Sequence, residues 1–322
     1  MERSSSFRSG IGVCILIIAL ARGAQAQYSG GSGTAQDPYL IATAADLIAL
    51  GQTPGDYDKH FVLTADIDLN PNLPGRRVFN EALIAPIRTI TRGVGIVDPI
   101  FMGVFDGNDH TISNLTIRGS GRLALFGASG YPAAITNLGL KDVDISGTGH
   151  DVGGLVSFNY GSITNCRSIG TISGSLSVGG LANMTYGSIS GSYSEGVVNG
   201  TNWVGGLVGR NSSGQVSNCY GVGTVTGNYD VGGLVGTSYA GSVLASFWDL
   251  RTSGQMISAG GTSKTTTEMQ TADTFLDAKW DFMGETVNGV EDLWWIVEGN
   301  DYPRLWWELN EAMPKSDETV DE

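Results

Sequence analysis

The side chains best suited to acid–base chemistry lie in one short segment, Asp106-Gly-Asn-Asp109-His110. A pair of carboxyl groups on either side of a glycosidic bond can hydrolyse it, one as general acid and the other as base or nucleophile. An imidazole titrates near neutral pH and can carry a proton in such a reaction. Four further carboxylates fall in neighbouring segments: Asp66, Asp68, Asp142 and Asp144. These residues define an enzymatic hypothesis, which requires a fold that brings them together.

The same segment also has a structural interpretation. Asp and Asn at the start of a tight turn accept hydrogen bonds from backbone N–H groups, which would account for Asp106 and Asn108. Calcium is a second use of such residues, because it binds several carboxylate and carbonyl oxygens. No Asp-x-Asp-x-Asp loop supports a calcium site. We therefore expect no cofactor, with calcium as the one ion that the composition leaves open.

Other catalytic signatures are missing from the sequence. The three histidines, His60, His110 and His150, do not form His-Glu-x-x-His, the zinc motif of metallopeptidases. There is no Gly-x-Ser-x-Gly, no phosphate-binding glycine loop with Lys, and no Cys-x-x-Cys. The sequence thus predicts no metal site and no catalytic residues. A carbohydrate-active enzyme using Asp106, Asp109 and His110, of the polysaccharide lyase or glycoside hydrolase kind, is the alternative.

Aromatic residues recur at equivalent positions and form the candidate binding site. The five residues are Tyr160, Tyr186, Tyr239, Trp203 and Tyr229. The first three each precede a glycine corner, with Ser213 at the intervening position, and the last two share another corner. Exposed rings of this kind stack on the apolar faces of sugars and on other rings. We predict a surface ridge for glycans or other surface proteins, and a purely structural ladder of rings is the alternative.

The elements that position these residues belong to a repeat. Val-Gly-Gly-Leu begins at Val152, Val178, Val204 and Val231, in steps of 26, 26 and 27 residues. Two degenerate copies are expected upstream, at residues 101–105 and 122–126. A period of this length, held over consecutive copies, is the mark of a stacked repeat architecture.

The repeat has the composition of strands and turns. It is rich in Gly, Ser, Thr and β-branched residues and poor in strong helix formers. Three short apolar pieces fit into one copy, for example 154–156, 162–164 and 171–173. At about 3.3 Å per strand residue, roughly 26 residues suit one turn of a three-sided parallel β-helix. The predicted fold is therefore all-β, a three-sided parallel β-helix, because a propeller blade needs about 40–45 residues.

Three columns of equivalent residues are expected to stack along the coil. One inward column comprises Ile112, Ile135, Ile163, Ile189, Val216 and Val243. A second comprises Ile145, Ile172, Val198 and Val225. An asparagine column comprises Asn114, Asn137, Asn165 and Asn218, with Gly191 in the gap.

These copies resemble the GLUG motif. The best match is Val204-Gly-Gly-Leu-Val-Gly-Arg-Asn, followed by Val216-Ser-Asn-Cys-Tyr220. Departures include Ser157 in place of Gly, Ala182-Asn183 in place of Val-Gly, and Arg167 where Tyr is usual. The motif is found in bacterial surface proteins, adhesin-like proteins and non-catalytic parts of IgA-cleaving metallopeptidases. The resemblance implies a solenoid over residues 101–246 with a structural or adhesive role, and it implies no activity.

The first 26 residues have the features of a signal peptide. Arg3 and Arg8 precede an apolar stretch over residues 11–20, and Ala24-Gln-Ala26 provides a cleavage site before Gln27. The apolar stretch is too short to span a bilayer. We therefore expect a secreted, extracellular or cell-surface protein that does not span the membrane after cleavage.

Cleavage would leave a strongly acidic chain. Lys and Arg fall from 18 to 15 and Asp and Glu from 32 to 31, so the formal charge becomes −16. This charge opposes contact with the phosphate backbone, and no nucleic-acid partner is expected.

Two cysteines would remain, Cys166 and Cys219. They occupy one column with Ser192 between them, which places them two rungs or roughly 9–10 Å apart. A disulfide needs Cα atoms within about 7 Å. We predict two buried free thiols.

The ends of a solenoid need caps. Residues 27–100 are expected to form the N-terminal cap and first rungs, with a strand at 39–41, a helix at 43–50 begun by Thr43, first rungs at 61–63 and 66–69, and a loop or irregular rung over 70–99.

Residues 247–307 are expected to form the C-terminal cap. Six of the seven tryptophans lie here, beside an expected helix at 264–278 and a strand pair at 293–297 and 304–307. The rings would plug the core, or else form a sugar platform. Residues 308–322 are expected to be an acidic, disordered tail.

Overall fold

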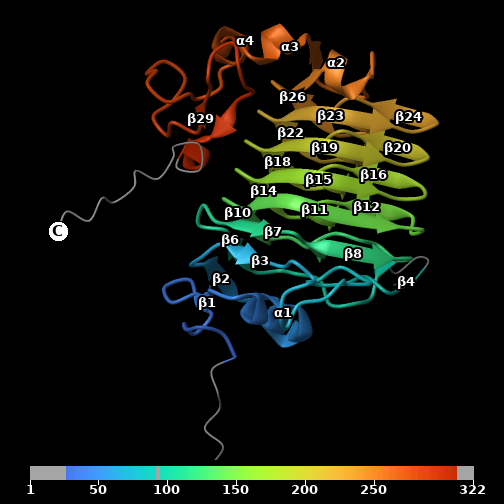
Figure 1. Ribbon diagram of the computed structural model, residues 1–322, viewed down its shortest axis with the longest axis vertical. Coiled ribbons are helices and arrows are strands. Elements are labelled where there is room, and N and C mark those ends of the chain that lie inside the picture. The colour runs from blue at the N-terminus through green and yellow to red at the C-terminus, as the bar shows by residue number, and fades with distance from the viewer. Residues whose placement is uncertain (1–26, 92–94, 310–322) are drawn as a thin grey trace, which may run out of the picture.

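The structure is a computed structural model that describes residues 27–91 and 95–309. Parallel strands stack into a solenoid that runs from helix α1 (Ala44–Gln52) at one end to helices α2 (Leu250–Ser253), α3 (Thr266–Met269) and α4 (Ala272–Leu276) at the other (Figure 1). The expected signal peptide lies outside the described residues, as does the expected tail from residue 310 onward. The all-β parallel solenoid is confirmed.

Two long sheets run the length of the coil. Sheet A consists of β1 (Tyr39–Ile41), β2 (His60–Leu63), β6 (Val104–Asp106), β10 (Ala134–Thr136), β14 (Ser162–Thr164), β18 (Ser188–Ser190), β22 (Gln215–Ser217) and β26 (Ser242–Leu244). Sheet B consists of β3 (Ile67–Asp68), β7 (Thr111–Ser113), β8 (Thr116–Gly119), β11 (Gly139–Gly147), β15 (Arg167–Ser173), β19 (Tyr193–Asn199), β23 (Tyr220–Thr226), β27 (Phe247–Asp249) and β28 (Thr262–Lys264).

Two shorter sheets complete each rung. Sheet C consists of β9 (Phe126–Ser129), β13 (Val156–Asn159), β17 (Ala182–Thr185), β21 (Val208–Asn211) and β25 (Val235–Ser238). Sheet D consists of β12 (Asp151–Gly153), β16 (Ser177–Gly179), β20 (Asn202–Gly205) and β24 (Tyr229–Gly232). A full rung thus has four strand segments, where the sequence suggested three, because the Val-Gly-Gly-Leu segment supplies two of them.

The glycines of the repeat allow the strands of sheets C and D to pack closely. A Cβ at Gly205, the last residue of β20, would lie 2.0 Å from the carbonyl oxygen of Val208 in β21. Gly153, Gly179 and Gly232 meet the equivalent carbonyl at 1.9–2.3 Å. No side chain fits at these distances, so the phrase is needed for the shape of the rung.

The two hydrophobic columns are confirmed over the regular rungs. Ile135, Ile163, Ile189, Val216 and Val243 follow one another in register, in steps of 28, 26, 27 and 27 residues. Ile145, Ile172, Val198 and Val225 do the same in sheet B. All of them except Val243 are buried in the main core.

The first rungs depart from the predicted register. Ile112 pairs with Leu140 and Ile67 in sheet B, while Phe105 precedes Ile135 in its column. The prediction for Ile112 was wrong because the upstream rungs differ in length.

The asparagine column needs the same correction. Asn137, Asn165 and Asn218 have left-handed backbones in one corner, with Gly191 between them. Asn114 instead shares a corner with Asp142, since its N–H donates to the carbonyl of Lys141.

The two expected degenerate copies had different outcomes. Leu123 pairs with Val152, so residues 122–126 hold the register of the repeat. Residues 101–105 do not, because Phe101 pairs with Ser129 and Val104 with Ala134. Their place is taken by an irregular rung, in which Ile84 pairs with Phe126.

The N-terminal cap agrees with the sequence. Thr43 and Asp46 form a reciprocal capping box at the start of α1, and β1, β2 and β3 form the first rungs. A short helix, η1 (Pro54–Asp56), and the hairpin of β4 (Ile90–Thr91) with β5 (Gly95–Ile96) complete this end.

The C-terminal region caps the coil and also packs beside it. Trp248 joins the main core, which is the expected plug. Trp280, Trp294 and Trp307 instead form a second core with Tyr193, Tyr220 and Phe247 on the outer side of sheet B. The expected helix at 264–278 is divided into β28, α3 and α4, and the expected strand pair is β29 (Trp294–Trp295) with β30 (Arg304–Leu305), followed by η2 (Trp306–Glu308).

Candidate functional site

The corner between sheets C and A carries the first set of predicted aromatic residues. The N–H of Tyr160 donates to the carbonyl of Ser129 in the preceding rung, and that of Tyr186 donates to Asn159. This shared register places the two rings face to face, with centroids 4.6 Å apart and planes inclined by 3°. Both rings remain partly open to solvent, at 36% and 39% exposure, and burial raises the pKa of the Tyr160 hydroxyl, with a smaller effect from Tyr186.

Tyr239 occupies the same column two rungs further on. Its N–H donates to the carbonyl of Asn211, and the N–H of Ser212 donates to that of Thr185. Ser212 is therefore the residue in the gap, rather than Ser213, because this copy is one residue longer at the corner. Tyr239 is 67% exposed. The column reads Tyr160, Tyr186, Ser212, Tyr239.

Trp203 and Tyr229 lie at a different corner, at the start of sheet D. Asn202 pairs with Tyr229, so the two aromatic residues belong to adjacent rungs. The guanidinium of Arg210 lies 4.8 Å from the centroid of the Trp203 ring and donates to Asp151 at 3.1 Å. Trp203 is thus engaged within the protein, while Tyr229 is 68% exposed. The predicted ridge consists of two sets on two corners.

The Asp106–His110 segment forms a tight turn. Oδ1 of Asp106 accepts from the N–H of Asn108 at 2.9 Å and from Nδ2 of Asn137 at 3.1 Å. Asn108 and Asp109 both have left-handed backbones. These are the contacts of the structural interpretation, in which the carboxylate holds the corner.

The other carboxylates serve as local hydrogen-bond acceptors. Asp66 lies 3.3 Å from Nδ1 of His110 and accepts from the N–H of Thr111 at 2.8 Å. Asp68 accepts from Asn114 at 2.9 Å, and Asp144 pairs with Arg118. Burial and the nearby Asp106 raise the pKa of Asp109. Within residues 27–91 and 95–309, no group of three or more His, Cys, Asp or Glu is arranged to hold a metal ion.

The most extensive polar network was not predicted from the sequence. Arg167, Tyr193, Tyr220 and Phe247 are successive residues of one column in sheet B. They face away from the main core and are covered by the C-terminal segment, which folds back beside the sheet (Figure 1). Tyr193 and Tyr220 stack with centroids 4.7 Å apart.

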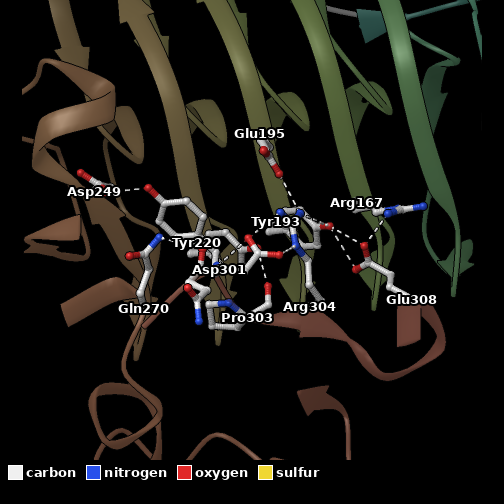
Figure 2. A network of polar contacts seen from close by, with 12 residues as sticks. Arg167, Tyr193, Glu195, Tyr220, Asp249, Gln270, Asp301, Pro303, Arg304 and Glu308 are labelled. Atoms are coloured by element: carbon white, nitrogen blue, oxygen red, sulfur yellow. Dashed lines mark hydrogen bonds and ion pairs between the residues drawn. The ribbon is translucent and has the colours of Figure 1, made fainter. Parts of the chain in front are cut away.

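Glu308 anchors this segment (Figure 2). Its carboxylate pairs with the guanidinium of Arg167 and accepts from the hydroxyl of Tyr193 at 2.8 Å. Trp307 lies under Arg167, with the guanidinium carbon 4.8 Å from the ring centroid. Glu308 is buried, so the acidic tail begins later than residue 308. Burial raises the pKa of Glu308, whereas Arg167 and Tyr193 lower it.

Arg304 extends the network toward the end of the coil. It donates to Glu195 at 2.7 Å, to Asp301 at 2.9 Å and to the hydroxyl of Tyr193 at 3.1 Å. The hydroxyl of Tyr220 donates to the carbonyl of Pro303 (Figure 2). A sequence signal for this surface was present, because Arg167, Tyr193 and Tyr220 each follow the inward residues Cys166, Ser192 and Cys219, and alternation places them outside.

Comparison with known proteins supports the solenoid and its type. Residues 148–173 match the GLUG motif. Halomucin of Haloquadratum walsbyi is 33% identical over 148 residues, which are 45% of this chain and 2% of halomucin. A candidate Gly-rich membrane protein of Evansella cellulosilytica is 31% identical over 164 residues, which are 48% of this chain and 18% of that protein. The chain thus corresponds to a small part of these relatives.

A solved structure shows the same fold. It is that of a Bacteroides ovatus protein described as a candidate immunoglobulin A1 protease, with a TM-score of 0.62 and 19% identity over 87% of this chain and 96% of that one. At this identity the similarity concerns the fold alone. In the part of the chain that the structure describes, no helix is both long and apolar enough to cross a membrane.

Proposed function

We propose that the protein is an exported, non-catalytic solenoid that serves as a structural and adhesive module outside the cell. The observation that carries this proposal is the column of tyrosines at the corner between sheets C and A. Tyr160, Tyr186 and Tyr239 are held on a hydrogen-bonded scaffold and present aromatic surface to solvent. Rings fixed in this way lose little side-chain freedom on binding, which favours contact with a partner surface.

The enzymatic alternative is less well supported by the geometry. A glycosidase needs two carboxyl groups about 5–10 Å apart across a substrate. Asp106 is occupied by hydrogen bonds within its turn, and Asp66 binds the backbone of Thr111. These contacts give both carboxylates a structural role.

Export is part of the proposal and has its own support. The segment before Gln27 has the order of a cleavable signal, and halomucin and the Gly-rich membrane protein are relatives whose names refer to a mucin and a membrane protein. A strongly acidic surface suits a solvated extracellular location. Expression of the full chain in a bacterial host should release a protein that begins at Gln27, as measured by intact mass. A chain that stays in the cytoplasm with residues 1–26 attached would contradict export.

Adhesion is tested by retention of the mature chain on cells and on an array of glycans. We expect retention, and we expect Tyr186→Ala to reduce it because this ring belongs to the exposed column. Tyr131→Ala is the matched control, since Tyr131 is 83% exposed and lies outside the column. Absence of retention on every surface, or an equal loss in both variants, would overturn the adhesive role of the tyrosines.

A further inference from the structure

The tyrosine column between sheets C and A has one position without a ring. Backbone hydrogen bonds place Tyr160, Tyr186, Ser212 and Tyr239 at the same point of four successive rungs. The rings of Tyr160 and Tyr186 stack at 4.6 Å, which is close to the rung spacing of about 4.8 Å. At Ser212 the side chain is a single hydroxymethyl group, so no ring of the protein continues the stack there.

This interruption creates a slot with an aromatic residue on each side. Tyr186 and Tyr239 lie two rungs apart, or roughly 9–10 Å along the coil. A flat ring placed above Ser212 would lie about 4.7 Å from each, which is the separation of stacked rings. One face of Tyr186 is covered by Tyr160, and its other face is directed toward this slot.

The surroundings of the slot are polar and uncharged. The three segments that frame it, 183–188, 209–214 and 236–241, contain no Asp or Glu. Their one basic residue, Arg210, is engaged by Trp203 and Asp151. The hydroxyls of Ser212, Ser213 and the two tyrosines remain as hydrogen-bond donors and acceptors. Neither a cationic nor an anionic ligand would find a counter-charge here.

We propose that the slot between Tyr186 and Tyr239 binds one neutral pyranose ring of a glycan. A pyranose has apolar C–H faces that stack on aromatic rings and hydroxyls at its edge that bond to Ser and Tyr. The inference rests on the proposed adhesive function and specifies its site and its ligand class. It makes Ser212 the residue that opens the site.

The sharpest test adds a ring. In Ser212→Tyr the new side chain should fill the slot and complete the column, so the total aromatic surface grows while the site disappears. Binding of neutral glucose, mannose and galactose tetrasaccharides by the mature chain is measured by calorimetry and by saturation-transfer NMR. We expect at least one sugar to bind the parent, and Ser212→Tyr to weaken it by about tenfold or more, the loss of one stacked face. Its melting temperature should equal or exceed that of the parent.

Matched variants separate the slot from a flat ridge. Tyr239→Ala removes one wall and should also weaken sugar binding about tenfold, which keeps the test valid if Ser212→Tyr fails to fold. Tyr160→Ala lies behind Tyr186 and should change affinity by no more than about twofold. Equal binding by parent and Ser212→Tyr would overturn the slot and leave the adhesive function standing.

Two other results would also overturn the inference. If the parent is retained on cells but binds none of the neutral sugars, the adhesive function stands and the pyranose assignment fails. If light scattering shows self-association that Ser212→Tyr abolishes, or if tyrosine- and phenylalanine-containing peptides compete for the slot, its occupant is an aromatic side chain of a protein.

Discussion

Cysteine and serine alternate in one buried column of the coil. Cys166 and Cys219 are unpaired and fully buried, and the hydroxyl of Ser192 lies between them and accepts from the N–H of Cys166 at 3.0 Å. Ser246 serves the N–H of Cys219 in the same way. Each thiol is thus a small apolar group in a hydrogen-bonded corner. This agrees with the free thiols predicted from the register.

Burial of the thiols should make stability depend on alkaline pH. Burial raises the pKa of both Cys166 and Cys219 to about 12, while an unfolded thiol titrates near 8.5. Because the folded pKa is raised, this contribution to stability is complete below about pH 8.5 and is lost as the pH rises toward 12. Urea unfolding between pH 8 and 11 should show a steeper fall for the parent than for Cys166→Ala/Cys219→Ala. Equal slopes would show that the thiols do not titrate on unfolding.

The inward column can be tested at a single residue. Val216 is fully buried between Ile189 and Val243, so Val216→Asp would place a carboxylate without a partner in the core. We expect a loss of about 4 kcal/mol or more in the free energy of unfolding. Gln215→Asp, on the exposed side of the same strand, should cost little. Equal melting temperatures for Val216→Asp and the parent would mean that the column does not face inward.

At the scale of elements, the turn from sheet D to sheet C depends on glycine. A methyl group at Gly205 would overlap the carbonyl oxygen of Val208, so Gly205→Ala should destabilise the protein by about 1–3 kcal/mol or more. A methyl group at Gly121 would meet no described atom within 4 Å, and Gly121→Ala should be neutral or slightly stabilising, by about 0.4–1 kcal/mol. Chemical denaturation of the pair measures the difference. A similar cost for both variants would argue against close packing as the reason for the motif.

The C-terminal segment is held to sheet B by a buried ion pair. Removal of one partner of such a pair costs about 3–5 kcal/mol because the other charge stays buried. Glu308→Ala should therefore loosen residues 304–309 and expose Trp307, as measured by hydrogen exchange and tryptophan fluorescence. Glu291→Ala is the control, since Glu291 is exposed. If exchange in this segment does not rise above that of the control, Glu308 does not anchor it.

The regular rungs could be predicted because the information is local and repeated. Ile163, Ile189 and Val216 recur with nearly constant spacing, and their register follows from counting. Ile112 and Asn114 were misplaced because β8 inserts an additional strand into the upstream part of sheet B and changes the rung length there. A fixed period cannot describe a rung of another length.

The C-terminal contact could not be predicted in the same way. Arg167 and Glu308 are 141 residues apart and belong to no common repeat. The departure of Arg167 from the tyrosine usual in the motif is explained by the structure, since an arginine at this point of the column bonds to Glu308 and stacks on Trp307. The tyrosine column was predicted, and its gap was misplaced by one residue because an insertion at a corner does not alter the β-branched pattern.

At the scale of the whole molecule, negative charge dominates the surface. The chain from Gln27 onward has a formal charge of −16, and many of its ion pairs are exposed, such as Arg88 with Glu81 and Lys59 with Asp58. Exposed pairs contribute little to stability. Repulsion among the remaining carboxylates should therefore oppose folding at low ionic strength.

Salt should stabilise the protein by screening this repulsion. Raising NaCl from about 10 mM to about 500 mM shortens the screening length several-fold, so the melting temperature should rise by a few degrees. CaCl2 at equal ionic strength separates screening from binding, because an ion bound only by the folded state adds stability in proportion to its occupancy. An equal rise in both salts indicates screening alone, and a larger rise in calcium indicates a specific site. A fall in NaCl would mean that favourable pairs outweigh the net repulsion, in spite of the excess of carboxylates.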